Sequence, residues 1–184
     1  MAGTSGTSSG RRQSAVLIPV PEAEPVVAEY RAKYDPVAAS GVPAHITLVV
    51  PWLAPDEITD ADVDELRDAL SGVEAFDFSL HAVSWFGRSV LWLSPEPAQP
   101  FQALTALLSE RFSTPPYDDE FDEVVPHLTV AHASDGVELA PVAAAIAPLL
   151  PVKCRADQVW MMVSPGPGAP PGPAWKVQAR VPLG

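Results

Sequence analysis

The sequence repeats one order of predicted elements, and each copy carries the same short motif, His-x-Thr. The motif is His45-Ile46-Thr47 in the first copy and His127-Leu128-Thr129 in the second. In each copy the predicted order is a helix, the motif strand, a second helix and two further strands. Such a repeat constrains the architecture, because two similar units can pack around an approximate two-fold axis. We therefore expect the two motif strands to lie side by side and to face one cleft.

Hydrophobic periodicity, proline positions and β-branched runs predict the individual elements. The expected helices are Pro25–Tyr34, Thr59–Leu70, Phe101–Phe112 and Pro141–Ala147. The expected strands are Ser14–Pro21, Pro43–Trp52, Phe76–Val83, Ser89–Ser94, Val124–His132, Lys153–Val163 and Trp175–Val181. The two other features are a hairpin turn and a proline-rich loop, expected at Gly87–Arg88 and Pro165–Pro173.

These elements predict an α+β, bilobal duplicated fold. We expect two antiparallel-rich sheets with outer helices and a central cleft that carries the two His-x-Thr strands. Residues 1–13 are rich in Gly, Ser and Thr and should form a flexible tail, which leaves residues 14–184 as a single bilobal domain.

Composition restricts the partners of this domain. The chain has 184 residues and a net charge of −12, which disfavours binding to a long polyphosphate backbone or to duplex nucleic acid. The single cysteine, Cys154, excludes an internal disulfide and suits a cytoplasmic setting. We expect it to be a small buried hydrophobe. No apolar run is long enough to span a membrane, and we expect a monomer.

The two motifs place polar pairs on otherwise apolar strands. Residues two apart in a strand share a face, so His45 and Thr47 should point together, as should His127 and Thr129. Two histidines that flank one phosphate can supply the base and the acid of an in-line displacement near neutral pH. The threonine hydroxyls can donate to the oxygens on which charge builds. Two His and two Thr are a poor zinc ligand set, so we expect neither metal nor cofactor.

The other two histidines lack a threonine two residues on. His81 falls on the polar face of its predicted strand. His132 lies five residues after His127, and a strict strand period places it on the opposite face. We interpret both as structural or surface residues.

The motif segments Ala44–Leu48 and Pro126–Val130 resemble those of the 2H phosphoesterase superfamily, which includes 2′-5′ RNA ligase-like proteins and 2′,3′-cyclic phosphodiesterases. The motif histidines are 82 residues apart, from 45 to 127, a separation typical of that family. The hairpin Trp85–Pro97 and the approach to the second motif are also similar. The resemblance implies a metal-independent phosphodiesterase acting on 2′,3′-cyclic or 2′-5′ phosphodiesters of RNA ends or small nucleotides.

The resemblance also implies roles for the motif residues. In hydrolysis of a cyclic phosphate, His45 would protonate the leaving oxygen and His127 would activate water, and the roles would exchange in the ligating direction. How the substrate lies in the cleft decides between these assignments, and both remain open. Thr47 and Thr129 would hold the phosphate. Ligase members often carry an arginine where this chain has His132, which favours a smaller substrate than a tRNA half.

Two aromatic residues complete the predicted substrate site. Tyr117, in an acidic proline-rich loop, could stack on a base or reach the phosphate, or it could anchor that loop. Phe86, next to Trp85 at the hairpin turn, could line a nucleobase pocket, although core packing is the alternative for at least one of the two. The acidic run Asp118–Glu123 is expected to be a solvated loop.

Two other functions are compatible with these residues. One is a non-catalytic module that binds nucleotides or RNA ends in the same cleft. The other is a metal-dependent hydrolase that combines histidine with the acidic loop.

Overall fold

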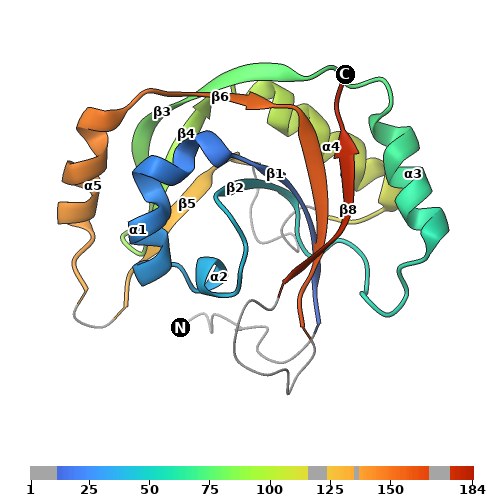
Figure 1. The fold of residues 1–184 in the computed structure, drawn as a ribbon, viewed down its shortest axis with the longest axis horizontal. Coiled ribbons are helices and arrows are strands. Elements are labelled where there is room, and N and C mark those ends of the chain that lie inside the picture. Colours follow the sequence, from blue (N-terminus) through green and yellow to red (C-terminus); the bar gives the residue numbers. More distant parts are fainter. Residues whose placement is uncertain (1–11, 116–123, 135–136, 166–174) are drawn as a thin grey trace.

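Two four-stranded antiparallel sheets form the centre of the molecule (Figure 1). The computed structural model describes residues 12–115, 124–134, 137–165 and 175–184. The first sheet has the order β2–β1–β7–β8, with β1 at Ser14–Pro19, β2 at His45–Val49, β7 at Gln158–Val163 and β8 at Lys176–Pro182. The second has the order β5–β4–β3–β6, with β3 at Phe76–Phe86, β4 at Val90–Glu96, β5 at Leu128–His132 and β6 at Val152–Ala156.

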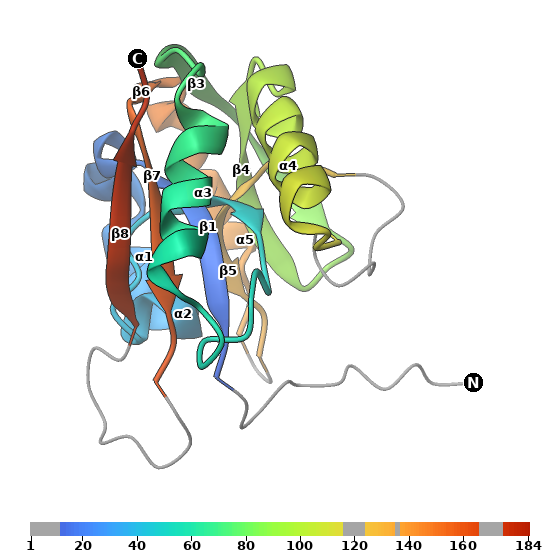
Figure 2. The same cartoon turned by 90° about the vertical axis from the view of Figure 1, so that its right-hand side faces the viewer.

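Helices flank the sheets on two sides. Figures 1 and 2 show α1 and α5 on one flank and α3 and α4 on the other. The helices are α1 (Glu24–Tyr34), α2 (Pro36–Ala39), α3 (Asp60–Leu70), α4 (Gln99–Phe112) and α5 (Ala140–Ile146). The predicted α+β class with two antiparallel sheets and outer helices is therefore confirmed. None of the helices in the described ranges is long and apolar enough to cross a membrane.

Local chemistry explains several element boundaries. Thr59 caps α3: its hydroxyl accepts from the backbone N–H of Asp62, whose carboxylate accepts from the N–H of Thr59, as the sequence predicted. Gly87, with a φ of 56°, lies in the predicted turn between β3 and β4. The expected tail (apart from Arg12 and Gln13) and the expected loop (apart from Pro165) lie outside the described residues.

A strand–helix–strand unit occurs twice and relates the two sheets. The units are β1–α1–β2 and β4–α4–β5, and each ends in a motif strand that returns antiparallel to its first strand. The packing is reciprocal, because α1 lies against β5 and α4 lies against β2. The strands β2 and β5 are the edges of their sheets and contact each other. The prediction that the motif strands lie side by side is confirmed, although the repeated unit begins one strand earlier than the sequence suggested.

The single strand predicted at Lys153–Val163 is wrong. The chain changes sheets at Asp157, so that β6 pairs with β3 in the second sheet while β7 lies between β1 and β8 in the first. The carbonyl of Asp157 accepts a hydrogen bond from the backbone N–H of Leu183 at 2.8 Å, outside either ladder. Strand periodicity reports which residues alternate but not which sheet they join, so a sheet change leaves no periodic signal.

The second motif strand is shorter than predicted. It begins at Leu128 and not at Val124, so His127 directly precedes the strand. Pro126 has no N–H to donate to a ladder, which explains why pairing does not extend upstream.

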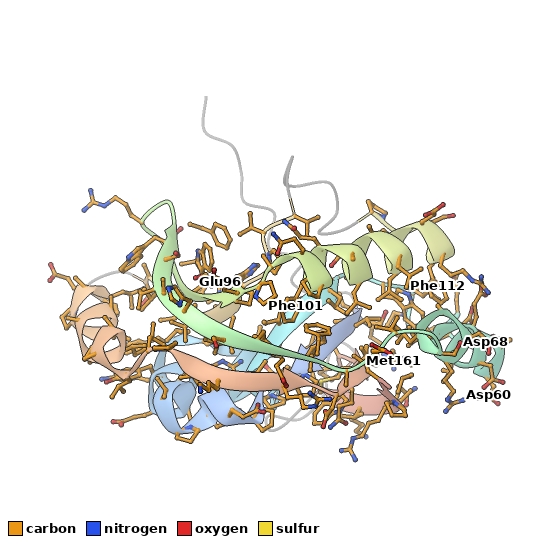
Figure 3. The ribbon with its side chains drawn as sticks, turned by 90° about the horizontal axis from the view of Figure 1, so that it is seen from above. Asp60, Asp68, Glu96, Phe101, Phe112 and Met161 are labelled. Atoms are coloured by element: carbon orange, nitrogen blue, oxygen red, sulfur yellow. The ribbon has the colours of Figure 1, made fainter. Side chains whose placement is uncertain are left out.

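One hydrophobic core connects both sheets and the helices. Phe101 of α4 is fully buried, and its ring meets those of Phe76 and Phe78 edge-on at centroid distances of 5.2 and 4.9 Å. Figure 3 shows Phe101 in the interior, while Asp60 and Asp68 lie at the periphery with α3. The motif strands contribute their apolar faces to this core through Ile46, Leu48, Leu128 and Val130, all fully buried. The histidine-bearing faces are thereby turned away from it.

The Phe101 cluster gives a direct test of this packing. Phe101→Ala is expected to lower the free energy of unfolding by about 3–5 kcal/mol, because it removes an aromatic ring from a filled core. Leu107→Ala on the same helix is the control: Leu107 is 37% exposed, so the expected loss is below about 1 kcal/mol. Urea denaturation of both variants makes the comparison, and equal losses would contradict the packing described.

Candidate active site

The two motif histidines have the same local geometry. Nδ1 of His45, the first residue of β2, lies 2.7 Å from the carbonyl oxygen of Pro43. Nδ1 of His127 lies 2.7 Å from the carbonyl oxygen of Val125. A carbonyl can only accept, so in each neutral ring Nδ1 carries the proton and Nε2 carries the lone pair. The repeated motif therefore fixes the same tautomer twice.

Burial makes His45 difficult to protonate. It lowers the pKa of His45 to about 4, although the hydrogen bond to the Pro43 carbonyl acts in the opposite direction. Arg31 lowers this pKa further, Asp35 raises it, and His127 lowers it by charge repulsion. This repulsion, together with the contact between β2 and β5, indicates that the two motif imidazoles lie within electrostatic reach of each other.

The second histidine has a similar environment. Burial lowers the pKa of His127, the hydrogen bond to the Val125 carbonyl opposes this, and His132 lowers the pKa further. Both motif imidazoles are therefore neutral at pH 7 in the absence of a bound anion.

The motif threonines lie on the same faces as their histidines. Cross-strand partners share a face, and the partner of Thr47 is Leu17, which lies outside the main core. The partner of Thr129 is Trp92 of β4. Both threonines are half-buried. The predicted orientation of each His-Thr pair, away from the core, agrees with this register.

Aromatic rings surround the second motif. Phe86 stacks on Trp92 with ring centroids 4.8 Å apart, and His127 meets Phe86 edge-on at 4.9 Å and Trp92 at 5.9 Å. The structure therefore brings Phe86, which the sequence suggested as a substrate-binding residue, directly against His127. The neighbouring Trp85 is 39% exposed. Tyr117 and the acidic run Asp118–Glu123 lie outside the described residues.

The prediction that His132 lies on the face opposite to His127 is wrong. In the ladder between β4 and β5, Trp92 pairs with Thr129 and Val90 pairs with His132. Trp92 and Val90 are two positions apart, but Thr129 and His132 are three positions apart, so β5 contains a bulge. The extra residue reverses the alternation and returns His132 to the face of Thr129. The charge of His132 accordingly lowers the pKa of His127.

The remaining polar residues separate into exposed and buried ones. His81 is exposed, with Nδ1 at 3.8 Å from a carboxylate oxygen of Glu96, which agrees with the predicted surface role. Cys154 is buried as predicted, and burial raises the pKa of its thiol to about 12. Within the described ranges, no group of three or more His, Cys, Asp and Glu side chains is arranged to hold a metal ion.

Three residues near the motifs carry no clear functional signal in the sequence. In the sequence, Trp92 is only one member of an apolar strand. Arg31 and Asp35 form a buried ion pair beside His45. The available signal was an arginine followed four residues later by an aspartate that precedes a proline, a pattern that suits a helix end and a new helix start.

Comparison with known proteins identifies the family. A family model described as the 2′-5′ RNA ligase superfamily matches residues 19–167. The chain belongs to this superfamily, and the resemblance to 2H phosphoesterases seen in the sequence is confirmed.

Individual relatives agree with this assignment. A Bacillus cytotoxicus protein provisionally named a phosphoesterase is 32% identical over 114 residues, which cover 61% of this chain and 64% of the relative. An Oceanobacillus iheyensis protein with the same kind of name is 32% identical over 104 residues, covering 55% and 58%. The chain thus spans about six tenths of the length of these relatives.

Solved structures show the same fold. TT0787 of Thermus thermophilus has a TM-score of 0.67 and 19% identity, covering 93% of this chain and 97% of that one. LigT of E. coli, in complex with NADP+, has a TM-score of 0.59 and 20% identity, covering 95% and 99%.

The half-buried His45 predicts how stability depends on pH. The folded-state pKa is about 4 and the unfolded value is near 6.5, so the unfolded chain binds the extra proton between these values. His45 therefore stabilises the fold fully above pH ~6.5, and up to about 3 kcal/mol is lost as the pH falls towards 4. Urea unfolding of the wild type and of His45→Gln, measured across this range, should show a flatter dependence for the variant. Parallel curves would contradict the lowered pKa of this imidazole.

Proposed function

We propose that this chain is a metal-independent phosphodiesterase that acts on 2′,3′-cyclic or 2′-5′ phosphodiesters of RNA ends or small nucleotides. The observation that carries the proposal is the matched pair of histidines, each with the same tautomer, at the starts of two edge strands that contact each other. Membership of the 2′-5′ RNA ligase superfamily supports a phosphoesterase-type reaction. The names of the two bacterial relatives support the same class.

Known ligands of a structural neighbour support a small nucleotide as the substrate. LigT of E. coli has been crystallised with 3′-AMP, phosphate and ATP as well as NADP+. The net charge of −12 also favours a short substrate over a long polyanion. We therefore propose a nucleotide or an RNA end with a cyclic phosphate as the partner.

In the proposed reaction, the Nε2 atoms of His45 and His127 carry out the two proton transfers. One neutral imidazole takes a proton from water as its oxygen bonds to phosphorus, and the other, protonated, gives its proton to the ribose oxygen as that bond breaks. The hydroxyls of Thr47 and Thr129 donate to the non-bridging oxygens, where negative charge increases. After one hydrolysis the two histidines have exchanged protonation states, and a proton exchange with solvent restores the pair.

The environments of the two histidines act on the proton in the same direction. Burial lowers the pKa of both His45 and His127, so these shifts do not by themselves assign the acid and the base. The orientation of the substrate decides between the two assignments, because the pair is symmetric enough to work in either direction.

Phe86 and Tyr117 complete the proposed substrate site. Phe86 is already held against His127 and Trp92, which makes it a wall next to the proposed phosphate position. A nucleobase or ribose could pack on the part of the ring that these neighbours leave uncovered. Tyr117 is proposed as a second contact on the basis of its sequence position.

Substitution of the motif histidines tests the chemistry. His45→Ala and His127→Ala are each expected to lower kcat on a 2′,3′-cyclic nucleotide by about 10²–10⁴-fold, because each removes a proton-transfer group. His81→Ala is the matched control, since that histidine is exposed and lies on another strand. Wild-type activity should be unchanged in excess EDTA. Full activity in either motif variant, or loss with EDTA, rules out the mechanism, and binding without turnover supports the non-catalytic alternative.

The pH dependence gives an independent check. The profile of kcat/KM reports the free enzyme and should be a bell with its maximum below pH ~6.5, because burial lowers the pKa of both histidines. The maximum for kcat should lie at higher pH, since a bound phosphodiester anion favours a protonated imidazole. The two limbs of the bell report apparent pKa values of the coupled histidine pair, not of one residue each. A sigmoidal kcat/KM profile with no acid limb would argue against two-histidine catalysis.

A further inference from the structure

The ion pair between Arg31 and Asp35 is almost completely buried, at 2% and 3% exposure. Nη2 and Nε of Arg31 donate to the same oxygen, Oδ2, of Asp35 at 2.9 and 3.2 Å. The third donor, Nη1, reaches the carbonyl oxygen of Val42 at 3.3 Å. All three guanidinium nitrogens therefore have acceptors, and one of these acceptors lies three residues before His45.

The second carboxylate oxygen of Asp35 faces two other elements. Oδ1 accepts a hydrogen bond from the backbone N–H of Val37 at 3.0 Å and so caps α2. The same oxygen lies 4.0 Å from Nε2 of His132, at the end of β5. The pair thus extends from the segment that enters the first motif to the strand that carries the second.

A second contact from α1 holds the same entry segment. The carboxylate of Glu24 accepts a hydrogen bond from the backbone N–H of Ala44 at 2.6 Å. Together with the bond from Arg31 to Val42, this fixes residues 42–44 at two points along α1. Residue 43 lies between these points, and its carbonyl accepts from Nδ1 of His45.

Stability alone is a weak explanation for such a pair. Removing two charges from water costs several kcal/mol, and buried ion pairs can often be replaced by apolar residues without loss of stability. A role in positioning the catalytic groups is a stronger explanation for the ion pair, because a displacement of about 1 Å in a catalytic group can lower the rate about 10²-fold.

We propose that Arg31 and Asp35 are positioning residues for the two motifs. Arg31 fixes the carbonyl of Val42 and with it the adjacent carbonyl of Pro43, which orients His45. Asp35 holds Arg31 in place and faces His132 on the second motif strand. The inference rests on the proposed function for its catalytic consequence. The orientation of His45 is a separate consequence that can be measured without any substrate.

The double variant Arg31→Met with Asp35→Asn tests this proposal. Methionine keeps the apolar stem of the arginine, and asparagine remains a good N-cap for α2, so folding should be retained. The matched control is Arg67→Met with Asp64→Asn, which removes the same residue types from an exposed ion pair on α3. The Tm of both double variants is measured first.

Two readouts then separate positioning from stability. Long-range ¹H–¹⁵N spectra of the imidazoles report the tautomer of each histidine. We expect His45 to lose its single Nδ1–H tautomer in the Arg31/Asp35 variant, while His127, held by Val125, keeps its own as an internal reference. On a 2′,3′-cyclic nucleotide we expect kcat to fall at least about tenfold with little change in KM. The control variant should match the wild type in both measurements.

Each outcome decides the proposal. An unchanged His45 tautomer together with an unchanged kcat in a folded double variant overturns it. If the His45 tautomer changes in the double variant but neither this variant nor the wild type turns over the nucleotide, the proposed function is refuted and the positioning role is supported. If the double variant does not fold, Arg31→Lys carries the test, since lysine keeps the charge but cannot reach Asp35 and Val42 with one planar fork. Wild-type tautomer and kcat in that variant then overturn the proposal.

Discussion

The contact between β2 and β5 is the interaction on which the site depends. Each strand is the edge of its own sheet, and the two edges meet without joining the sheets into one. An exposed edge is a liability in most β proteins, because its unpaired backbone groups can pair with other chains. Here the two edges contact each other, and the helix of each unit packs on the motif strand of the opposite unit. The contact between the edges therefore also brings the two motifs together.

Burial gives this arrangement its electrostatic character. The backbone carbonyls that orient the two imidazoles also favour their protonated forms, but desolvation is the larger effect in both cases. The result is a neutral pair that gains a proton most readily when an anion lies between the rings. A phosphodiester would therefore help to create the protonation state that its own cleavage requires, which is consistent with the proposed function.

Much of the fold and the core of the site could be predicted from local sequence patterns. The alternation around His45 and His127 indicated which face each pair occupies, and the core contacts of Ile46 and Leu128 agree. The errors share one cause, which is dependence on a partner strand. A bulge in β5 returned His132 to the face of Thr129, and the sheet change at Asp157 divided an apparently continuous strand. The Arg31–Asp35 pair depends on tertiary burial, which helical spacing alone cannot indicate.

The order of strands in the first sheet has a consequence for synthesis of the chain. β1 lies between β2, which follows it within the first fifty residues, and β7, which begins at Gln158. One side of β1 therefore remains without its ladder until β7 has left the ribosome. Contacts of such long sequence separation slow folding, because the entropy of loop closure is lost before the strand pairing contributes stabilising free energy. Between the synthesis of β1 and that of β7, the nascent protein thus carries an open, apolar strand edge, and the first sheet cannot be completed until β7 and β8 emerge.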